Sequence, residues 1–170
     1  VPFLILTLIV ILIGGIVEMV PTFLIKSNVP TISSVKPYTP LELQGRDIYI
    51  REGCYTCHSQ MIRPFRSETS RYGEYSKAGE FVYDRPFQWG SKRTGPDLAR
   101  EGVGNNRKTN SWHYNHMDAP QALSTGSIMP SYSFMLDKDL DTASTPSKIR
   151  VMQKLGVPYP AGYDQIANKE

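Results

Sequence analysis

The sequence has 170 residues, a length that suits one small domain with an appendage. Its 19 basic and 16 acidic residues give a formal net charge of +3, which is too small an excess for a nucleic-acid-binding surface. Hydrophobic residues make up an ordinary 40% of the chain, but they are concentrated at its start.

Residues 1–25 are almost wholly apolar and predict a single membrane anchor. About 20 apolar residues, at 1.5 Å per residue, cross the ~30 Å hydrocarbon core of a bilayer. A cleavable signal peptide would have a shorter apolar region and a small-residue cleavage site, and neither feature is seen. Because the chain begins at Val1 instead of methionine, we expect it to be part of a longer or processed protein.

Glu18 is the one charge in this segment, and it admits two interpretations. A carboxylate within a membrane span is costly and often marks a functional contact, which here would be with a partner subunit inside the membrane. The alternative is that Glu18 lies near the end of the helix, close to Pro21, and reaches the lipid headgroups.

Residues 26–38 are predicted to be a linker, because they are rich in Ser, Thr and Pro and show no helical period. A helix is predicted for the stretch that follows, residues 39–53. Thr39 can serve as its N-cap, Pro40 suits the first helical position, and Glu42 completes a capping box.

One side of this predicted helix carries an apolar face that includes Leu41, Ile48 and Tyr49. Gly45 is expected to leave room for another helix to cross. Gly53 is expected to break the helix immediately before the cysteines.

The segment "CYTCH" holds both cysteines of the chain, Cys54 and Cys57, followed directly by His58. A dithiol redox site, a zinc site and a covalent haem site all use C-x-x-C. A zinc site usually needs a second pair of ligands, and a redox dithiol has no need of the histidine. We therefore favour one c-type haem, with both thiols bound to its vinyl groups and His58 bound to its iron.

Aromatic and charged residues alternate in the segment after this motif, about residues 65–94. We expect this insert to contact a partner subunit instead of filling a core of its own, because aromatics and Arg are favoured at buried interfaces. An ordinary surface loop is the alternative. The aromatic residues concerned are Tyr72, Tyr75, Phe81, Tyr83, Phe87 and Trp89.

The segment "TGPDLA", residues 94–99, resembles the G-P-x-L segment of many small c-type cytochromes. A haem-ligating histidine normally donates its second ring N–H to a carbonyl, which fixes the tautomer and the ring direction. The resemblance suggests that the carbonyl of Pro96 receives the proton of His58. A turn that opens a helix at Asp97 is a compatible, simpler interpretation.

A second axial ligand for the iron is best sought among the methionines, because thioether sulfur raises the haem potential. Met61 follows His58 too closely to reach the other side of the ring. Met129 lies in an extended segment before a proline, as a distal ligand would, although most methionines only fill cores. His113 and His116 are the alternative ligands.

A last helix is predicted over residues 145–155, with Thr145 as its cap, Pro146 at the first helical position and Gly156 as its stop. The preceding carboxylates, Asp137 to Asp141, are interpreted as a solvated acidic turn.

Taken together, these motifs resemble the membrane-anchored mono-haem cytochrome c subunit of cbb-three-type haem–copper cytochrome c oxidases. The resemblance covers nearly the whole chain, and the insert makes it specific. It rests on the segments "GGIVEMVP", "YTPLELQGRDIYIREGCYTCHSQMIRPFR", "RYGEYSKAGEFVYDRPFQWGSKRTGPDLAR", "WHYNH", "IMPSY" and "KLGVPY".

What the resemblance implies is a mostly α protein: one transmembrane helix (1–25), a linker (26–38) and a class I cytochrome c domain (39–170) with a long irregular insert. It implies His58 and Met129 as the axial ligands of one haem c. It also implies a final helix of the family beyond Glu170.

The expected function is electron transfer without catalysis by this chain itself, within an oxygen-reducing, proton-pumping oxidase complex. The expected partners are the catalytic haem–copper subunit, a further cytochrome c subunit as electron donor, and membrane lipid, with no nucleic acid. Because c-type haem is attached outside the inner membrane, the haem domain is expected in the bacterial periplasm. A free-standing membrane-anchored cytochrome shuttle and a haem gas sensor are the alternatives.

Overall fold

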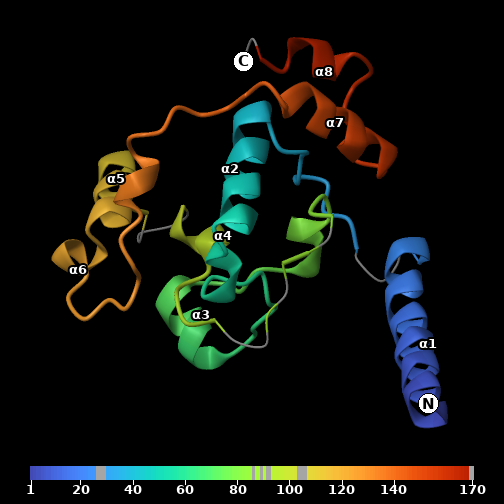
Figure 1. The fold of residues 1–170 in the computed structure, drawn as a ribbon. Coiled ribbons are helices and arrows are strands. Elements are labelled where there is room, and N and C mark those ends of the chain that lie inside the picture. The colour runs from blue at the N-terminus through green and yellow to red at the C-terminus, as the bar shows by residue number, and fades with distance from the viewer. Residues whose placement is uncertain (26–29, 86, 89, 91–92, 103–106, 169–170) are drawn as a thin grey trace.

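The computed structural model describes residues 1–25, 30–85, 87–88, 90, 93–102 and 107–168. Over these residues the chain is mostly helical, with no strand (Figure 1). The helices are α1 (Pro2–Leu24), α2 (Pro40–Arg51), η2 (Cys54–Thr56), α3 (Arg66–Tyr72), η3 (Ala78–Phe81), α4 (Leu98–Glu101), α5 (Asn110–Asp118), α6 (Pro120–Leu123), η5 (Ser133–Met135), α7 (Thr145–Lys154) and α8 (Tyr163–Ile166).

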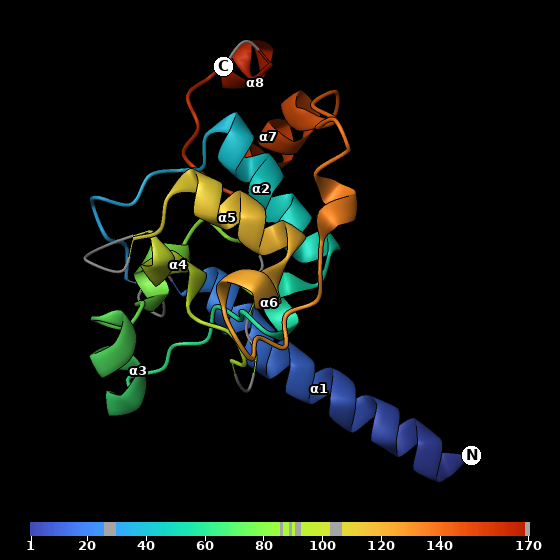
Figure 2. The ribbon, with the colours of Figure 1, turned by 90° about the vertical axis from the view of Figure 1, so that its left-hand side faces the viewer.

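Helix α1 fits the predicted membrane anchor. Its stretch Pro2–Pro21 is 20 residues long and has a mean hydropathy of 2.8, and none of it is buried inside the rest of the protein. Figures 1 and 2 both show α1 projecting away from the other helices. By length and composition it is the one candidate membrane span among the described residues.

Helix α2 begins as the sequence predicts, with a complete capping box. The backbone N–H of Thr39 donates to Glu42 Oε2 at 2.8 Å, and the hydroxyl of Thr39 accepts from the backbone N–H of Glu42. The helix is followed by Gly53 in the left-handed conformation, at φ 72°. Both ends are therefore confirmed, and they deliver the chain to Cys54.

The core lies where α7 packs against α2 and α8 packs against α7, at the top of Figure 1. It is centred on Leu43 and Ile149, which are both fully buried. The apolar face predicted for α2 is therefore partly wrong, because Leu41 is 68% exposed. The predicted crossing at Gly45 is also wrong, since no atom lies within 4 Å of where its Cβ would be. In the structure, Leu43 and Gln44 of α2 contact α7.

Thr145 differs from its predicted role as a cap. Helix α7 is preceded by Ser144, and Thr145 is buried, with its hydroxyl accepting a hydrogen bond from the amide of Gln44. Lys148 Nζ donates to the other end of that amide, at 2.9 Å. A buried amide such as that of Gln44 must be hydrogen-bonded. The Thr145 hydroxyl therefore serves this tertiary contact and does not cap α7. Gly156 ends the helix as predicted, at φ 87°.

The insert turns some of its aromatic rings inward. Phe81 is buried, and Tyr83 packs against the core cluster. The prediction that these rings serve a partner instead of a core is therefore wrong for these two residues. Tyr72, Tyr75 and Phe87 are half-buried, and Trp89 lies outside the described residues.

A buried carboxylate, Asp84, fixes the end of the insert's short helix η3. Its Oδ2 accepts hydrogen bonds from Tyr38 Oη at 2.9 Å and from Gln60 Nε2 at 3.0 Å. Burial raises the pKa of Asp84, and these two hydrogen bonds oppose that rise. These hydrogen bonds join the insert to Tyr38, two residues before α2, and to Gln60, two residues after His58.

The segment that follows the membrane helix is packed against the insert. Gly79 in η3 is buried, and a Cβ added there would lie 2.3 Å from the carbonyl oxygen of Pro30 and 2.9 Å from a side-chain carbon of Ile32. Only glycine allows this approach, because non-bonded carbon contacts are normally about 3.5–4.0 Å. Residues 30–32 are thus docked on the domain.

Candidate functional site

The two cysteines and the histidine lie close together along the chain, on the tight turn η2 and the two residues that follow it. The backbone N–H groups of Cys57 and His58 both donate to the carbonyl oxygen of Cys54, at 3.2 and 2.8 Å. Gly53 provides the left-handed entry into this turn. Both thiols are free, and that of Cys57 is exposed.

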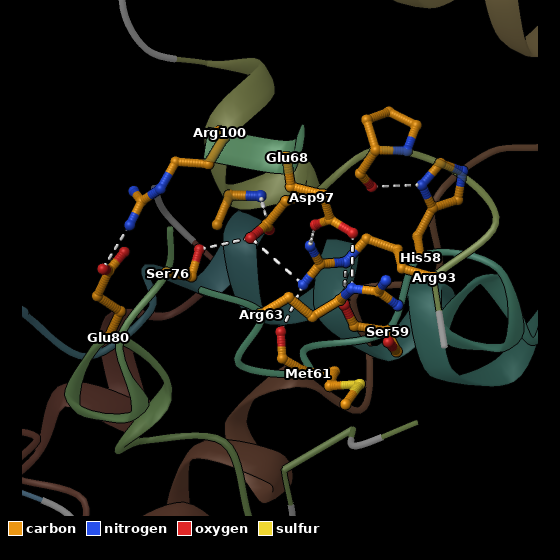
Figure 3. A network of polar contacts seen from close by, with 12 residues as sticks. His58, Ser59, Met61, Arg63, Glu68, Ser76, Glu80, Arg93, Asp97 and Arg100 are labelled. Atoms are coloured by element: carbon orange, nitrogen blue, oxygen red, sulfur yellow. Dashed lines mark hydrogen bonds and ion pairs between the residues drawn. The ribbon is translucent and has the colours of Figure 1, made fainter. Parts of the chain in front are cut away.

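The ring of His58 is held by a backbone carbonyl. Its Nδ1 lies 2.9 Å from the carbonyl oxygen of Pro96, as Figure 3 shows. The Tyr49 hydroxyl donates to the carbonyl oxygen of His58 at 2.7 Å, so the backbone at this residue is fixed as well. With Nδ1 engaged as donor, Nε2 is the nitrogen that can bind a metal.

Gly95 packs directly against the ring of His58, a contact that the sequence analysis did not predict. A Cβ at this position would lie 2.2 Å from Cε1 of His58 and 2.6 Å from Nδ1. The backbone N–H groups of Thr94 and Gly95 both donate to Cys57 at 2.9 Å, so the segment cannot easily move away. The signal available in the sequence was the glycine of "TGPDLA" itself.

Burial raises the pKa of the Cys54 thiol, a backbone hydrogen bond opposes that rise, and the charges of Glu52 and Cys57 add to it. A raised pKa disfavours the thiolate, which is the attacking species of a redox dithiol. In the part of the chain that the structure describes, no three His, Cys, Asp or Glu side chains are grouped as a metal ion would need.

Helix α5 carries the two alternative histidine ligands, His113 and His116. His116 stacks on Trp112, with ring centroids 4.4 Å apart and an angle of 12° between the planes. The pKa of His116 is lowered by burial and then by the nearby charges of His113 and His58. Of the two alternative histidine ligands, His116 is half-buried and His113 is exposed.

The loop that carries Met129 returns to the same place. Tyr132 donates its backbone N–H to Met117 at 2.7 Å, which ties the loop to the end of α5. The pKa of Tyr132 is raised by burial and then by the neighbouring Cys54 and Cys57. Met129 itself is half-buried. Tyr132, three residues after Met129, therefore lies near the two cysteines.

These residues fit a covalently bound haem. Two free thiols stand on one turn beside an imidazole whose Nδ1 is engaged and whose Nε2 is left for iron. The close seat at Gly95 gives the ring one orientation. Two possible further ligands, Met129 and His116, are both half-buried.

The chain matches, over residues 1–170, the family described as cytochrome C oxidase, mono-heme subunit/FixO. No curated protein matches its sequence.

Proposed function

This chain belongs to the FixO family of cytochrome c oxidase mono-heme subunits, and on that premise we propose that it relays electrons through one covalent haem c to the haem-containing catalytic subunit that reduces oxygen. The observation that carries the proposal is the ring of His58, held by the Pro96 carbonyl beside two free thiols. Haem c, when bound, supplies an iron centre that takes up and releases one electron.

Each residue has a distinct part in this proposal. Cys54 and Cys57 would hold the haem covalently, and His58 and Met129 would be the residues that bind its iron. The Pro96 carbonyl would keep the proton on Nδ1, which leaves Nε2 of His58 available to the iron. No residue is assigned acid or base chemistry, because the protein sets the potential and position of the haem.

The docked linker favours a fixed relay over a mobile shuttle. Pro30 is only five residues after Ile25, and five residues span at most about 18 Å. Because Pro30 packs on Gly79, η3 stays within that reach of the end of the membrane helix. A shuttle would need a tether that lets the haem domain travel.

Replacing Gly79 by alanine tests this point. The added Cβ cannot coexist with the Pro30 carbonyl at 2.3 Å, so the linker should lift from the domain. We expect faster proteolytic cleavage of residues 26–38 and slower oxidase turnover, with the haem content and visible spectrum retained.

Gly45→Ala is the matched control for this variant, because an added Cβ there meets no atom within 4 Å. It should leave both cleavage and turnover unchanged, and stability should rise by roughly 0.5–1 kcal/mol, since alanine is favoured over glycine inside a helix. Wild-type cleavage and turnover in Gly79→Ala would argue against the fixed relay.

The proposed sixth ligand is tested by Met129→Leu. Leucine has nearly the same volume, so the cost to folding should stay below about 1.5 kcal/mol. The sulfur-to-iron absorption band near the red edge should disappear, the reduction potential should fall, and carbon monoxide should bind the reduced protein. Retention of the band together with exclusion of carbon monoxide would mean that another residue binds the iron, and His116 would be replaced next.

Location and partners complete the proposal. Helix α1 would cross the bacterial inner membrane once, in contact with lipid and with the catalytic subunit, and the haem domain would face the periplasm. A further cytochrome c subunit would supply the electrons. Purification in mild detergent should yield this chain together with the haems of a catalytic subunit; isolation of the chain alone, with a single haem c, would favour the shuttle.

A further inference from the structure

Arg93 is a buried cation beside the proximal histidine. Its side chain is 3% exposed, and a buried guanidinium is costly unless its nitrogens are all paired. Nε donates to the carbonyl oxygen of Ser59 at 3.0 Å and Nη2 to that of Met61 at 2.6 Å. Nη1 donates to Glu68 Oε2 at 2.8 Å, and Nη2 lies 3.4 Å from Asp97 Oδ2 (Figure 3).

Three of the four partners of Arg93, namely Ser59, Met61 and Asp97, come from the two segments that also hold His58. Ser59 directly follows His58, and Asp97 directly follows Pro96. The guanidinium therefore bridges the same two segments as the hydrogen bond between Nδ1 and the Pro96 carbonyl.

Two side chains of the insert, those of Glu68 and Ser76, contact Arg93 and its partner Asp97. Glu68 of α3 accepts from Arg93 and also pairs with Arg63 Nε at 2.6 Å. Ser76 donates its hydroxyl to Asp97 Oδ2 at 2.7 Å, which holds the carboxylate in place. Part of the insert is thus built around Arg93.

We propose that Arg93 is a positioning residue for His58, which locks the segment after the histidine to the segment of Gly95 and Pro96 and thereby sets the reduction potential of the haem. The inference rests on the proposed function. A histidine that donates a strong Nδ1–H bond to a carbonyl is a more basic ligand and favours ferric iron. If the bridge loosens, that hydrogen bond weakens, and the reduction potential rises.

The test separates positioning from charge. Arg93→Lys keeps the charge, but a single ammonium cannot reproduce the planar fork with its several acceptors. The double variant Arg93→Gln with Glu68→Gln removes one charge of each sign. Both should carry covalent haem, keep the sulfur-to-iron band and show a raised potential in a redox titration of the full-length holoprotein.

Arg100→Gln is the matched control. Arg100 is 15% exposed and pairs with Glu80 at 2.5 Å instead of bridging the segments around His58. The Arg100→Gln variant should lower thermal stability without a change of the reduction potential.

Should the double variant not accumulate, the reduction potential of Arg93→Lys decides alone. A wild-type potential in Arg93→Lys overturns the proposal, since the residue would then act through its charge. Loss of covalent haem from the wild-type chain would instead refute the proposed function.

Discussion

Replacement of both Cys54 and Cys57 by alanine is expected to abolish covalent haem on this chain. The two thiols lie on one tight turn and are the only cysteines in the sequence, so no other side chain can form the thioether bonds. On a denaturing gel stained for haem, the band at 19.2 kDa should be absent, while an immunoblot still detects the polypeptide.

Single replacements are the controls for this loss. Cys54→Ala and Cys57→Ala each leave one thiol on the turn, so each should retain some covalent haem, in reduced amount. Neither thiol is engaged in a disulfide, so the fold does not depend on their pairing. A haem-stained band at full intensity in the double variant would refute covalent attachment at this motif.

Gly95→Ala is expected to displace the ring of His58 although it adds a single methyl group. The Cβ would lie 2.2–2.7 Å from three ring atoms, far inside the ~3.5 Å of an ordinary carbon contact. The backbone cannot retreat without breaking the bonds from Thr94 and Gly95 to Cys57. The ring must therefore turn, which breaks its hydrogen bond to Pro96.

The expected cost combines overpacking of about 1–3 kcal/mol and a lost hydrogen bond of about 1 kcal/mol. Thermal unfolding of the holoprotein should shift to lower temperature, and the low-spin spectrum with two axial ligands should be partly lost. Gly102→Ala is the control, because Gly102 has φ −88° and an added Cβ there meets no atom within 4 Å. Equal stability and identical spectra for the two variants would show that Gly95 does not seat the histidine.

Two sets of contacts connect the insert to the rest of the protein. Gly79 holds residues 30–32 on the insert, and Arg93 joins the insert to the segments on both sides of His58. The insert thus connects residues 30–32 to the turn that carries Cys54, Cys57 and His58. This offers a reason for an insert that a small diffusible cytochrome does not need.

Much of the local structure followed from the sequence alone. The capping box of Thr39 and Glu42, the break at Gly53 and the membrane-length apolar run each depend on residues within one or a few turns of one another. Cys54, Cys57 and His58 could be proposed together as haem-binding residues because all three belong to one contiguous motif. Pro96 came from the resemblance of its segment to other cytochromes, and the structure places its carbonyl 2.9 Å from the ring.

The tertiary structure alone decided which side chains meet across the chain. Gln44 and Thr145 are 101 residues apart, and Arg93 and Ser59 are 34 apart, so no local pattern announces either hydrogen bond. The face of α2 that became buried, the inward turn of Phe81 and the seats at Gly79 and Gly95 depend on how helices and loops pack. Caps and turns use short-range hydrogen bonds, which a sequence pattern records directly, whereas the burial of a polar group is stable only when distant partners satisfy it.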